Sequence, residues 1–411
     1  MQKKNKRRFG HRKHLDSIRG IACLLVILFH CEIPLFSNGY LGVDVFFTLS
    51  GFLITSILLE ELSDRGEIDL VRFYCRRFSR LFPASCVVLV STTFVYKQIE
   101  LTEYVDKHKS SFFASAFYVE NWHALKSSMD YFTDDASDQS PVMHYWSLSI
   151  EEQFYLFFPL LLSLLWHICQ KNLTQLIYLF SIILLFATSF NYYLWSQNAM
   201  MSYLSTFGRL YQLLAGSLLS IFVVIGKMKD TFIDKNKASF KTLTDIISGL
   251  LVTFFAVTLF YFRNSETLYM GQLSVLLSVM IFAILEISSD NGKIRLLLFE
   301  NSFLCYIGKL SYSMYLCHVP ITKFGEILET FSVNEYLRAA QILGFKKKYE
   351  KFYYIDLGEL LFSNTSESFS FDALDGNVAV WDDLNHISPA FAKKKLQDMV
   401  KELMNQNVSI I

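Results

Sequence analysis

Long apolar runs, separated by short polar stretches, fill most of the chain up to residue 325. Each run is roughly 17–22 residues long, which is the length that an α-helix needs to cross the hydrocarbon core of a bilayer. We expect nine membrane-spanning helices, at 15–36, 40–59, 80–97, 146–168, 173–195, 207–226, 243–262, 268–287 and 303–325. The pattern therefore predicts an all-α polytopic membrane protein.

A weaker apolar segment at residues 111–122 leaves the number of spans at nine or ten. If this segment is short or re-entrant, Lys171, the 227–241 loop and Lys293 all fall in the cytoplasm, as the positive-inside rule favours. The number of spans, and with it the side of the membrane that holds the C-terminus, stays open.

Charge is distributed unevenly, although the formal net charge of the 411 residues is zero. Residues 1–14 contain seven Lys/Arg and no acid, so they are predicted to form a basic cytoplasmic N-terminus. That cluster makes the first span an anchor rather than a cleaved signal peptide. A nucleic-acid-binding arm is the alternative, but a basic cluster beside a membrane span favours a lipid surface. We expect the bilayer, and no nucleic acid, as a partner.

The cysteines give no sign of a disulfide framework or a metal site. There are seven, at 23, 31, 75, 86, 169, 305 and 317, all within or beside apolar runs. Their number is odd and none has CxxC spacing, so neither a disulfide framework nor a zinc site is supported. No metal is expected.

Arg19 and His30 lie eleven residues apart in the first apolar run. At about 100° per residue this spacing places both on one helical face, about 16 Å apart along the axis. Charged and ionisable groups in a membrane helix are costly and favour a polar cavity or a partner. A fixed cation can hold an anionic group, and a near-neutral imidazole can accept a proton. The alternative is an anchoring Arg and an interfacial His at opposite ends of one span.

The first motif is the run at 15–30. Four further motifs follow it in order, at 39–54, 73–83, 144–155 and 310–320. In this order and spacing the chain resembles the integral-membrane acyltransferase family 3, whose members are O-acetyltransferases that modify sugars. The resemblance covers about residues 15–320, and residues 15–325 are predicted to form a membrane acyltransferase domain.

The resemblance implies transfer of an acyl group, foremost acetyl, from acyl-CoA to a hydroxyl of a carbohydrate or lipid-linked acceptor. Acyl-CoA would be a donor substrate, and no permanently bound cofactor is expected. Such a transfer needs a base for the hydroxyl proton, cationic groups for the donor and exclusion of water. The implied roles are His30 as the base and Arg19 and Glu151 as electrostatic organisers.

Arg77 and Arg80, three residues apart at the start of the third run, are neighbours on one helical face. Two planar guanidiniums suit the phosphates of coenzyme A, and the resemblance favours this donor-binding role. Ordinary positive-inside anchoring is the alternative.

Ser147, Glu151 and Tyr155 follow each other at intervals of four residues and share one face of an otherwise apolar helix. An intramembrane carboxylate is a functional candidate by default, and Glu151 is expected to fix Arg19 or position the acceptor. Glu152 and Gln153 are expected to point elsewhere.

Three other positions are secondary site candidates with open alternatives. His144 precedes its span, and a histidine in an aqueous loop is the alternative. Tyr315 and His318 bring a phenol and an imidazole together near the last span, where a packing role is slightly favoured. Asp44 is expected to pair with an Arg or to orient His30. Gln212 stands where the family usually has Glu, which removes a possible partner for Arg209.

Residues 335–411 are polar and differ from the rest of the chain. Asp383 and His386 resemble the Asp-x-x-His pair at the end of an SGNH hydrolase domain. The Gly-Asp-Ser block that carries the nucleophile of such domains is absent from residues 1–411, and a His and an Asp alone cannot form an acyl-enzyme. This region is predicted to be an incomplete, catalytically inert α/β remnant.

Two functions from other classes compete with acyl transfer. A transporter would also place charges inside the membrane, but no internal repeat or pair of broken helices supports it. A catalytically inactive membrane scaffold would keep the fold without activity, and the intact Arg19, His30 and Glu151 argue against it.

Overall fold

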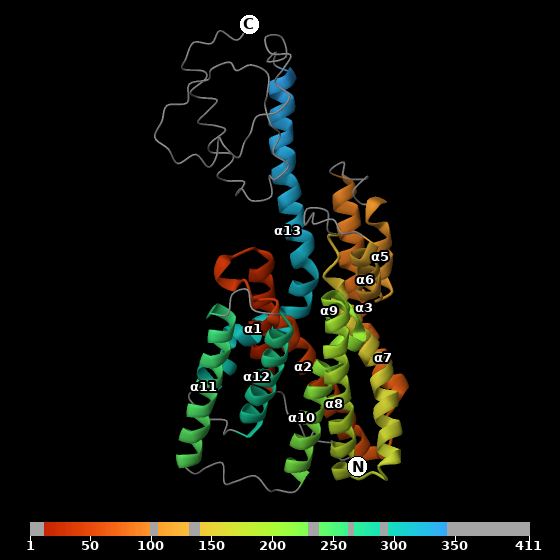
Figure 1. The fold of residues 1–411 in the computed structure, drawn as a ribbon, viewed down its shortest axis with the longest axis vertical. Coiled ribbons are helices and arrows are strands. Elements are labelled where there is room, and N and C mark those ends of the chain that lie inside the picture. The colour runs from red at the N-terminus through yellow and green to blue at the C-terminus, as the bar shows by residue number, and fades with distance from the viewer. Residues whose placement is uncertain are drawn as a thin grey trace, which may run out of the picture. The chain divides into compact units, whose positions relative to one another are not determined.

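The computed structural model describes residues 12–98, 106–130, 140–228, 238–261, 267–287 and 295–342, which are helical and contain no strand. In chain order the elements are α1 (Lys13–His30), the 3₁₀ turn η1 (Pro34–Phe36), α2 (Leu41–Arg65), α3 (Leu70–Gln98), α5 (Lys109–Ala116), α6 (Glu120–Asp130), α7 (Tyr145–Ile168), α8 (Leu173–Gln197), α9 (Ala199–Leu204), α10 (Thr206–Met228), α11 (Ala238–Tyr261), α12 (Thr267–Ile287), the π-helical turn η3 (Arg295–Phe299) and α13 (Ser302–Ile342). Figure 1 shows the long helices side by side. The predicted all-α fold is confirmed, and the predicted α/β remnant lies almost wholly outside the described residues.

Seven of the described helices, namely α2, α3, α7, α8, α10, α11 and α12, are long and apolar enough to cross a membrane. Each of the nine predicted spans coincides with a helix. The other two are α1, which carries Lys13, Asp16 and Arg19 within 18 residues, and α13. The fold is that of an integral, multi-pass membrane protein.

Helices α1 and α3 each differ from the predicted span at one boundary. Helix α1 ends at His30 instead of residue 36, because Glu32 has a left-handed backbone (φ 54°) and Pro34 starts a separate turn. Helix α3 starts at Leu70, ten residues before the predicted span, and continues through Pro83. The segment 111–122, which the sequence left open, is not one continuous helix: it forms parts of the short helices α5 and α6, with the left-handed residue Tyr118 (φ 54°) between them.

Helix α2 lies at the centre of the helical packing, where most of its side chains are buried. It packs most extensively on α10, and two glycines allow this approach. A Cβ on Gly51 would collide with the Leu213 carbonyl of α10, and one on Gly216 would collide with the Thr48 carbonyl of α2. The pair α1 and α13 meets in the same way at Gly20 and Gly308. These crossings fix the relative positions of the helices that carry the candidate site.

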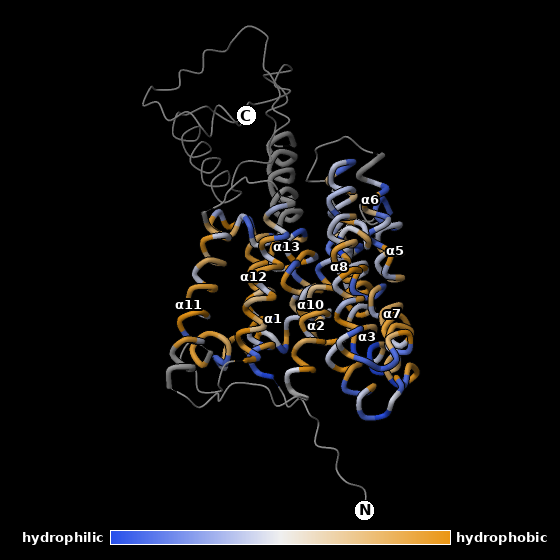
Figure 2. The backbone as a smooth tube through the Cα atoms, turned by 60° about the horizontal axis from the view of Figure 1, so that its bottom comes forward, coloured by the Kyte–Doolittle hydropathy of each residue, from blue (hydrophilic) through white to orange (hydrophobic). Residues whose placement is uncertain are grey.

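Apolar side chains cover the outside of the described helices as well as their interior. On α8, for example, Ile182, Leu185 and Phe186 are 65–69% exposed, as expected of a surface that faces lipid. Figure 2 shows hydrophobic residues along α11 and α12.

The chain divides into two compact units near Thr322. The first unit contains helices α1 to α12 and the part of α13 up to Thr322, and it holds all the structural features discussed below. The predicted domain limits at 325 and 335 remain predictions.

Candidate functional site

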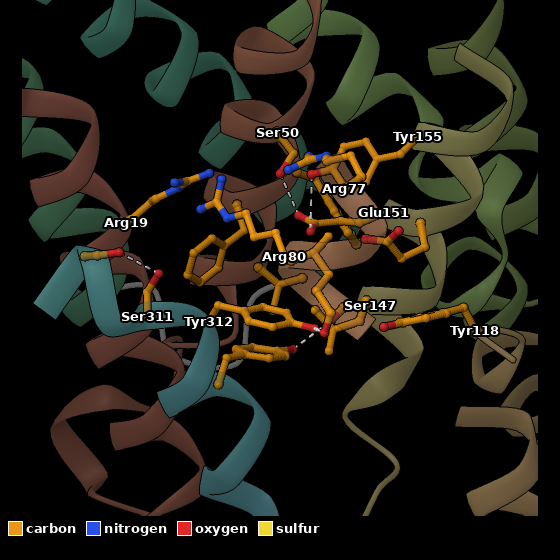
Figure 3. Close-up of a pocket in the computed structure, with 18 of the residues that line it drawn as sticks. Arg19, Ser50, Arg77, Arg80, Tyr118, Ser147, Glu151, Tyr155, Ser311 and Tyr312 are labelled. Atoms are coloured by element: carbon orange, nitrogen blue, oxygen red, sulfur yellow. Dashed lines mark hydrogen bonds between the residues drawn. The ribbon is translucent and has the colours of Figure 1, made fainter. Parts of the chain in front are cut away.

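A cavity of about 810 Å³, including the space at its mouth, lies between α1, α2, α3, α7 and α13. We call it the arginine cavity, because Arg19, Arg77 and Arg80 all line it (Figure 3). Its other polar lining residues are Ser50, Tyr118, Ser147, Glu151, Glu152, Tyr155, Lys309, Ser311, Tyr312 and Tyr315. Arg80 and Lys309 are exposed, which places the opening at their end of the cavity. The structure thus brings together six of the predicted site residues: Arg19, Arg77, Arg80, Ser147, Glu151 and Tyr315.

The carboxylate of Glu151 is held by two hydroxyls. Ser50 Oγ donates a hydrogen bond of 2.7 Å to Glu151 Oε1, and Tyr155 donates one of 3.4 Å to Oε2. The predicted common face of Ser147, Glu151 and Tyr155 is confirmed, since all three line the cavity. The expectation that Glu152 points elsewhere was wrong. The cavity is wide enough to include the next residue around the helix.

The cationic groups of the cavity outnumber its acids. Three guanidiniums and Lys309 face two carboxylates, Glu151 and Glu152. Within the described part of the chain, Arg19 and Arg80 have no hydrogen bond or ion pair. Arg77 lies 3.9 Å above the centre of the Tyr155 ring, and its Nε is buried without a hydrogen-bond partner. Planar donors that are not satisfied by the protein suit an anion with several oxygens, such as a phosphate.

His30 does not line the arginine cavity. It ends α1, and its ring packs against His318 of α13 with the centroids 4.9 Å apart. His318 in turn contacts His144, at 5.1 Å, and Tyr315, at 5.0 Å. The Tyr315 hydroxyl, which lines the cavity, is 2.6 Å from Ser147 Oγ. We call His30, His144 and His318 the histidine cluster. Tyr315 and His318 lie between His30 and the cavity.

The hydrogen bonds of the histidine cluster fix its tautomers. Nδ1 of His30 lies 2.9 Å from the Val26 carbonyl, and Nδ1 of His318 lies 2.6 Å from the Tyr315 carbonyl. A carbonyl oxygen can only accept, so each Nδ1 carries the proton and each Nε2 has a lone pair. His144 uses Nε2 toward the Leu316 carbonyl, at 3.1 Å, which leaves its lone pair on Nδ1. Nε2 of His30 is therefore the nitrogen able to accept a proton.

His144 is 3% exposed, so the alternative of a histidine in an aqueous loop is wrong. Two lone pairs of the cluster, on His144 Nδ1 and His318 Nε2, are buried and have no hydrogen-bond partner. Among the described residues no group of three or more His, Cys, Asp or Glu is arranged to hold a metal ion.

Asp44 forms a buried ion pair with Arg209, with 3.0 Å between Oδ1 and Nη1. Gln212 Nε2 donates a 2.9 Å hydrogen bond to the same Oδ1. Of the two roles expected for Asp44, pairing with an arginine is the one seen. Arg209 does have a partner, and Gln212 supports that pair.

The α5–α6 hairpin places Tyr118 in the cavity wall, which the sequence analysis missed. Ser111 Oγ donates a 2.7 Å hydrogen bond to Glu120, and His123 Nδ1 lies 3.5 Å from the same carboxylate. Burial raises the pKa of Glu120, and the interaction with Glu120 raises the pKa of His123. No signal in the sequence ties this hairpin to the site.

Lys309 and Ser50 were also missed. Lys309 stands just before the motif at 310–320, and Ser50 lies inside the motif at 39–54. Asp383 and His386 lie outside the described residues.

A family model described as an acyltransferase domain matches residues 12–332. The chain belongs to this acyltransferase family. The match includes every element that lines the arginine cavity and the histidine cluster, so the family resemblance expected from the motifs is confirmed. It ends before the region predicted to be an SGNH-like remnant.

Curated relatives in Staphylococcus aureus carry the name O-acetyltransferase OatA. The proteins of strains NCTC 8325 / PS 47 and MRSA252 are each 34% identical over 335 residues, which cover 80% of this chain and 52% of theirs. The chain thus spans about half the length of the curated relatives it matches. No solved structure shows significant similarity to it.

Proposed function

We propose that the chain is a membrane O-acyltransferase that moves an acetyl group from acetyl-CoA to a hydroxyl of a carbohydrate or lipid-linked acceptor. The observation that supports this most strongly is the arginine cavity, in which Arg19 and Arg80 have no hydrogen bond or ion pair among the described residues. The name of the relatives supports an O-linked acetyl product.

In this proposal the arginine cavity holds the phosphates of the donor. Arg77 and Arg80 grip them near the mouth, where Arg80 and Lys309 are exposed. A Lys or Arg in this position gives charge-assisted hydrogen bonds to phosphate oxygens. Glu151, held by Ser50 and Tyr155, balances part of the positive charge.

The reaction needs a proton acceptor near the acceptor hydroxyl. As the hydroxyl oxygen forms its bond to the acetyl carbon, His30 Nε2 takes the hydroxyl proton and the carbon–sulfur bond of the thioester breaks. The proton then passes to the leaving thiolate, which regenerates the neutral imidazole. About 16 Å of helix separates Arg19, in the wall of the arginine cavity, from His30, so the donor must extend from the cavity toward the end of α1 to bring its thioester to His30. Coenzyme A has a long flexible arm between its phosphates and its sulfur atom.

The basic residues before Leu15 support a cytoplasmic N-terminus. Arg77 and Arg80 lie near the start of α3, at the end of the bundle that holds the start of α1. The mouth of the arginine cavity then opens toward the cytoplasm, where acetyl-CoA is made.

Purified protein in lipid nanodiscs, supplied with a saccharide acceptor, should release coenzyme A from acetyl-CoA as the acetyl group moves to the acceptor hydroxyl, and a thiol reagent detects this release. Arg19→Lys should be severely impaired because a point charge cannot replace a planar fork. A transporter or an inactive scaffold would not consume acetyl-CoA. Absence of thiol release by wild-type protein, with folded protein verified by thermal melting, would reject the proposal in favour of one of these alternatives.

A further inference from the structure

A second cavity, of about 360 Å³ including the open space at its mouth, lies at the other end of the helices. Asp44 and Arg209 lie in the first turns of α2 and α10, and Asn191 and Trp195 lie in the last turns of α8. Helix α1 runs about 27 Å from the end that holds Arg19 to the end that precedes α2. The second cavity is therefore at the end where His30 lies.

The charge of this cavity is balanced, in contrast to that of the arginine cavity. Its one guanidinium, Arg209, is paired with Asp44 at 3.0 Å and also donates from Nε to the Tyr203 carbonyl at 2.8 Å. The guanidinium carbon lies 4.2 Å from the centre of the Tyr203 ring. Because Arg209 already has these partners, the described residues that line the cavity include no unpaired cationic group for an anion, and the cavity suits a neutral ligand.

One polar atom in the cavity wall is unsatisfied. Asn191 is 3% exposed, and its amide nitrogen donates to Ser202 Oγ at 2.7 Å and to the Gly208 carbonyl at 2.8 Å. Its Oδ1 is buried without any hydrogen-bond partner. A buried acceptor without a donor destabilises the protein, so a ligand with a hydrogen to donate would satisfy this atom. Oδ2 of Asp44 likewise accepts no hydrogen bond from the described residues, since Arg209 and Gln212 both use Oδ1.

Aromatic rings form much of the remaining wall: Tyr40, Trp195, Tyr203 and Tyr211. Trp195 is half-buried and stands beside the exposed Ala199, so it lies at the opening. Aromatic faces pack against the C–H face of a sugar ring, while fixed acceptors such as Asn191 Oδ1 bind its hydroxyls. A neutral cavity that combines both groups matches a saccharide.

The position of the cavity also fits an acceptor. Tyr40 in its wall packs on Phe29 at 5.7 Å, and Phe29 packs on His30 at 5.1 Å. On its other side, Trp146 packs on Tyr203 at 4.9 Å, and the residue after Trp146, Ser147, lines the arginine cavity. Two aromatic side chains, Tyr40 and Phe29, thus connect the second cavity with His30.

We propose that this second cavity binds a neutral saccharide unit of the acceptor, with Asn191 Oδ1 and Asp44 Oδ2 accepting sugar hydroxyls and Trp195 covering one face of the ring. This inference rests on the proposed acyl transfer for its biological meaning, but binding can be measured without any donor. The two cavities would then serve the two substrates from opposite ends of the helices.

The test uses full-length protein in nanodiscs and equilibrium dialysis with labelled maltotriose and chitotriose, in the absence of acetyl-CoA. We expect at least one of these saccharides to bind, and Trp195→Ala and Asn191→Leu each to weaken its binding at least tenfold. Tyr193→Ala is the matched control, because Tyr193 lies on the same helix, is 55% exposed and does not line the cavity. Since the Asn191 amide also holds Ser202 and Gly208, thermal melting must show that its variant is folded; Trp195→Ala, at the opening, carries the test if it is not.

Transfer assays add a second readout. Trp195→Ala should raise the Michaelis constant for the saccharide while leaving that for acetyl-CoA unchanged. Failure of both saccharides to bind wild-type protein, or equal weakening by Tyr193→Ala, would overturn the inference. Saccharide binding without any consumption of acetyl-CoA would reject the acyltransferase proposal and leave the saccharide site standing. Consumption of acetyl-CoA with saccharide Michaelis constants that neither variant changes would reject the saccharide site and leave the acyltransferase proposal standing.

Discussion

The imidazole rings of His30 and His318 pack edge to face, with their centroids 4.9 Å apart and their planes at 72°. His318 lies three residues after Tyr315, whose hydroxyl reaches Ser147 in the wall of the arginine cavity. These contacts connect His30 with a cavity that it does not itself line. The proposed base and the proposed donor site are therefore linked through α13.

Replacing His30 with Gln should abolish acyl transfer and leave the protein folded. The Gln amide can still donate to the Val26 carbonyl, but it cannot accept a proton at the position of Nε2. A positioned base contributes about 10²–10⁴ in rate, so we expect a loss of that size in the turnover number, measured by thiol release from acetyl-CoA.

His167→Gln provides the matched control for this variant. His167 also lies at the end of a helix, and its Nδ1 contacts the carbonyl four residues earlier, Ser163, at 2.7 Å. It is exposed and does not line the arginine cavity, so its variant should keep full activity. Retention of more than about a tenth of the activity by His30→Gln would reject His30 as the base.

Breaking the Asp44–Arg209 pair from one side should destabilise the protein. Asp44→Leu leaves a buried guanidinium without its counter-ion, which costs about 3–5 kcal/mol. The double variant Asp44→Leu/Arg209→Met removes both charges and should recover much of the loss. Thermal melting of the nanodisc protein measures both, and a single variant as stable as the wild type would show that the pair contributes nothing.

The α5–α6 hairpin should lose stability as the pH rises. The pKa values of Glu120 and His123 are both raised in the folded state, so the folded hairpin binds more protons than the unfolded chain. The contribution of His123 is complete below its ordinary pKa of about 6.5 and is lost as the pH passes its raised value. That of Glu120 is lost in the same direction at lower pH.

Hydrogen exchange of residues 109–130 between pH 5 and pH 9, corrected for the intrinsic rate, measures this change. Protection should decrease with rising pH in the wild type. In His123→Gln, the decrease at the higher pH values, where His123 would lose its proton, should be smaller. Protection that increases with pH would contradict the assignment of the two shifts.

Replacing Asp383 and His386 with Ala should leave acyl transfer unchanged. This pair has no Gly-Asp-Ser nucleophile block within residues 1–411, and the family match ends at residue 332. Transfer should be measured at matched membrane abundance. Loss of transfer in a truncation that lacks 343–411, with the double variant active, would mean that this region shapes the acceptor site by packing.

The sequence allowed the helices and six of the residues that line the arginine cavity to be predicted, because these depend on local spacing. Apolar runs of membrane length mark the spans, and a four-residue interval puts Ser147 and Glu151 on one face. The ends of α1 and α3 were misplaced, because hydropathy does not register the left-handed Glu32 or the polar first turns of α3.

Contacts between distant elements could not be predicted from spacing. The Arg19–His30 spacing suggested one shared site, whereas only Arg19 lines the cavity. The partner of Arg209 is 165 positions away, and His144 meets the Leu316 carbonyl across 172 positions. Such pairs follow from helix packing, which a single sequence does not specify.

The most direct test of the account compares two double variants of α3 that remove the same charge. Arg77→Gln/Arg80→Gln alters the cavity wall, whereas Arg72→Gln/Arg76→Gln changes two exposed arginines that do not line it. We predict that the first raises the Michaelis constant for acetyl-CoA at least tenfold, that high salt reproduces part of this effect in the wild type, and that the second leaves the constant unchanged. An unchanged constant in Arg77→Gln/Arg80→Gln, or the same increase in both variants, would contradict donor binding in the arginine cavity.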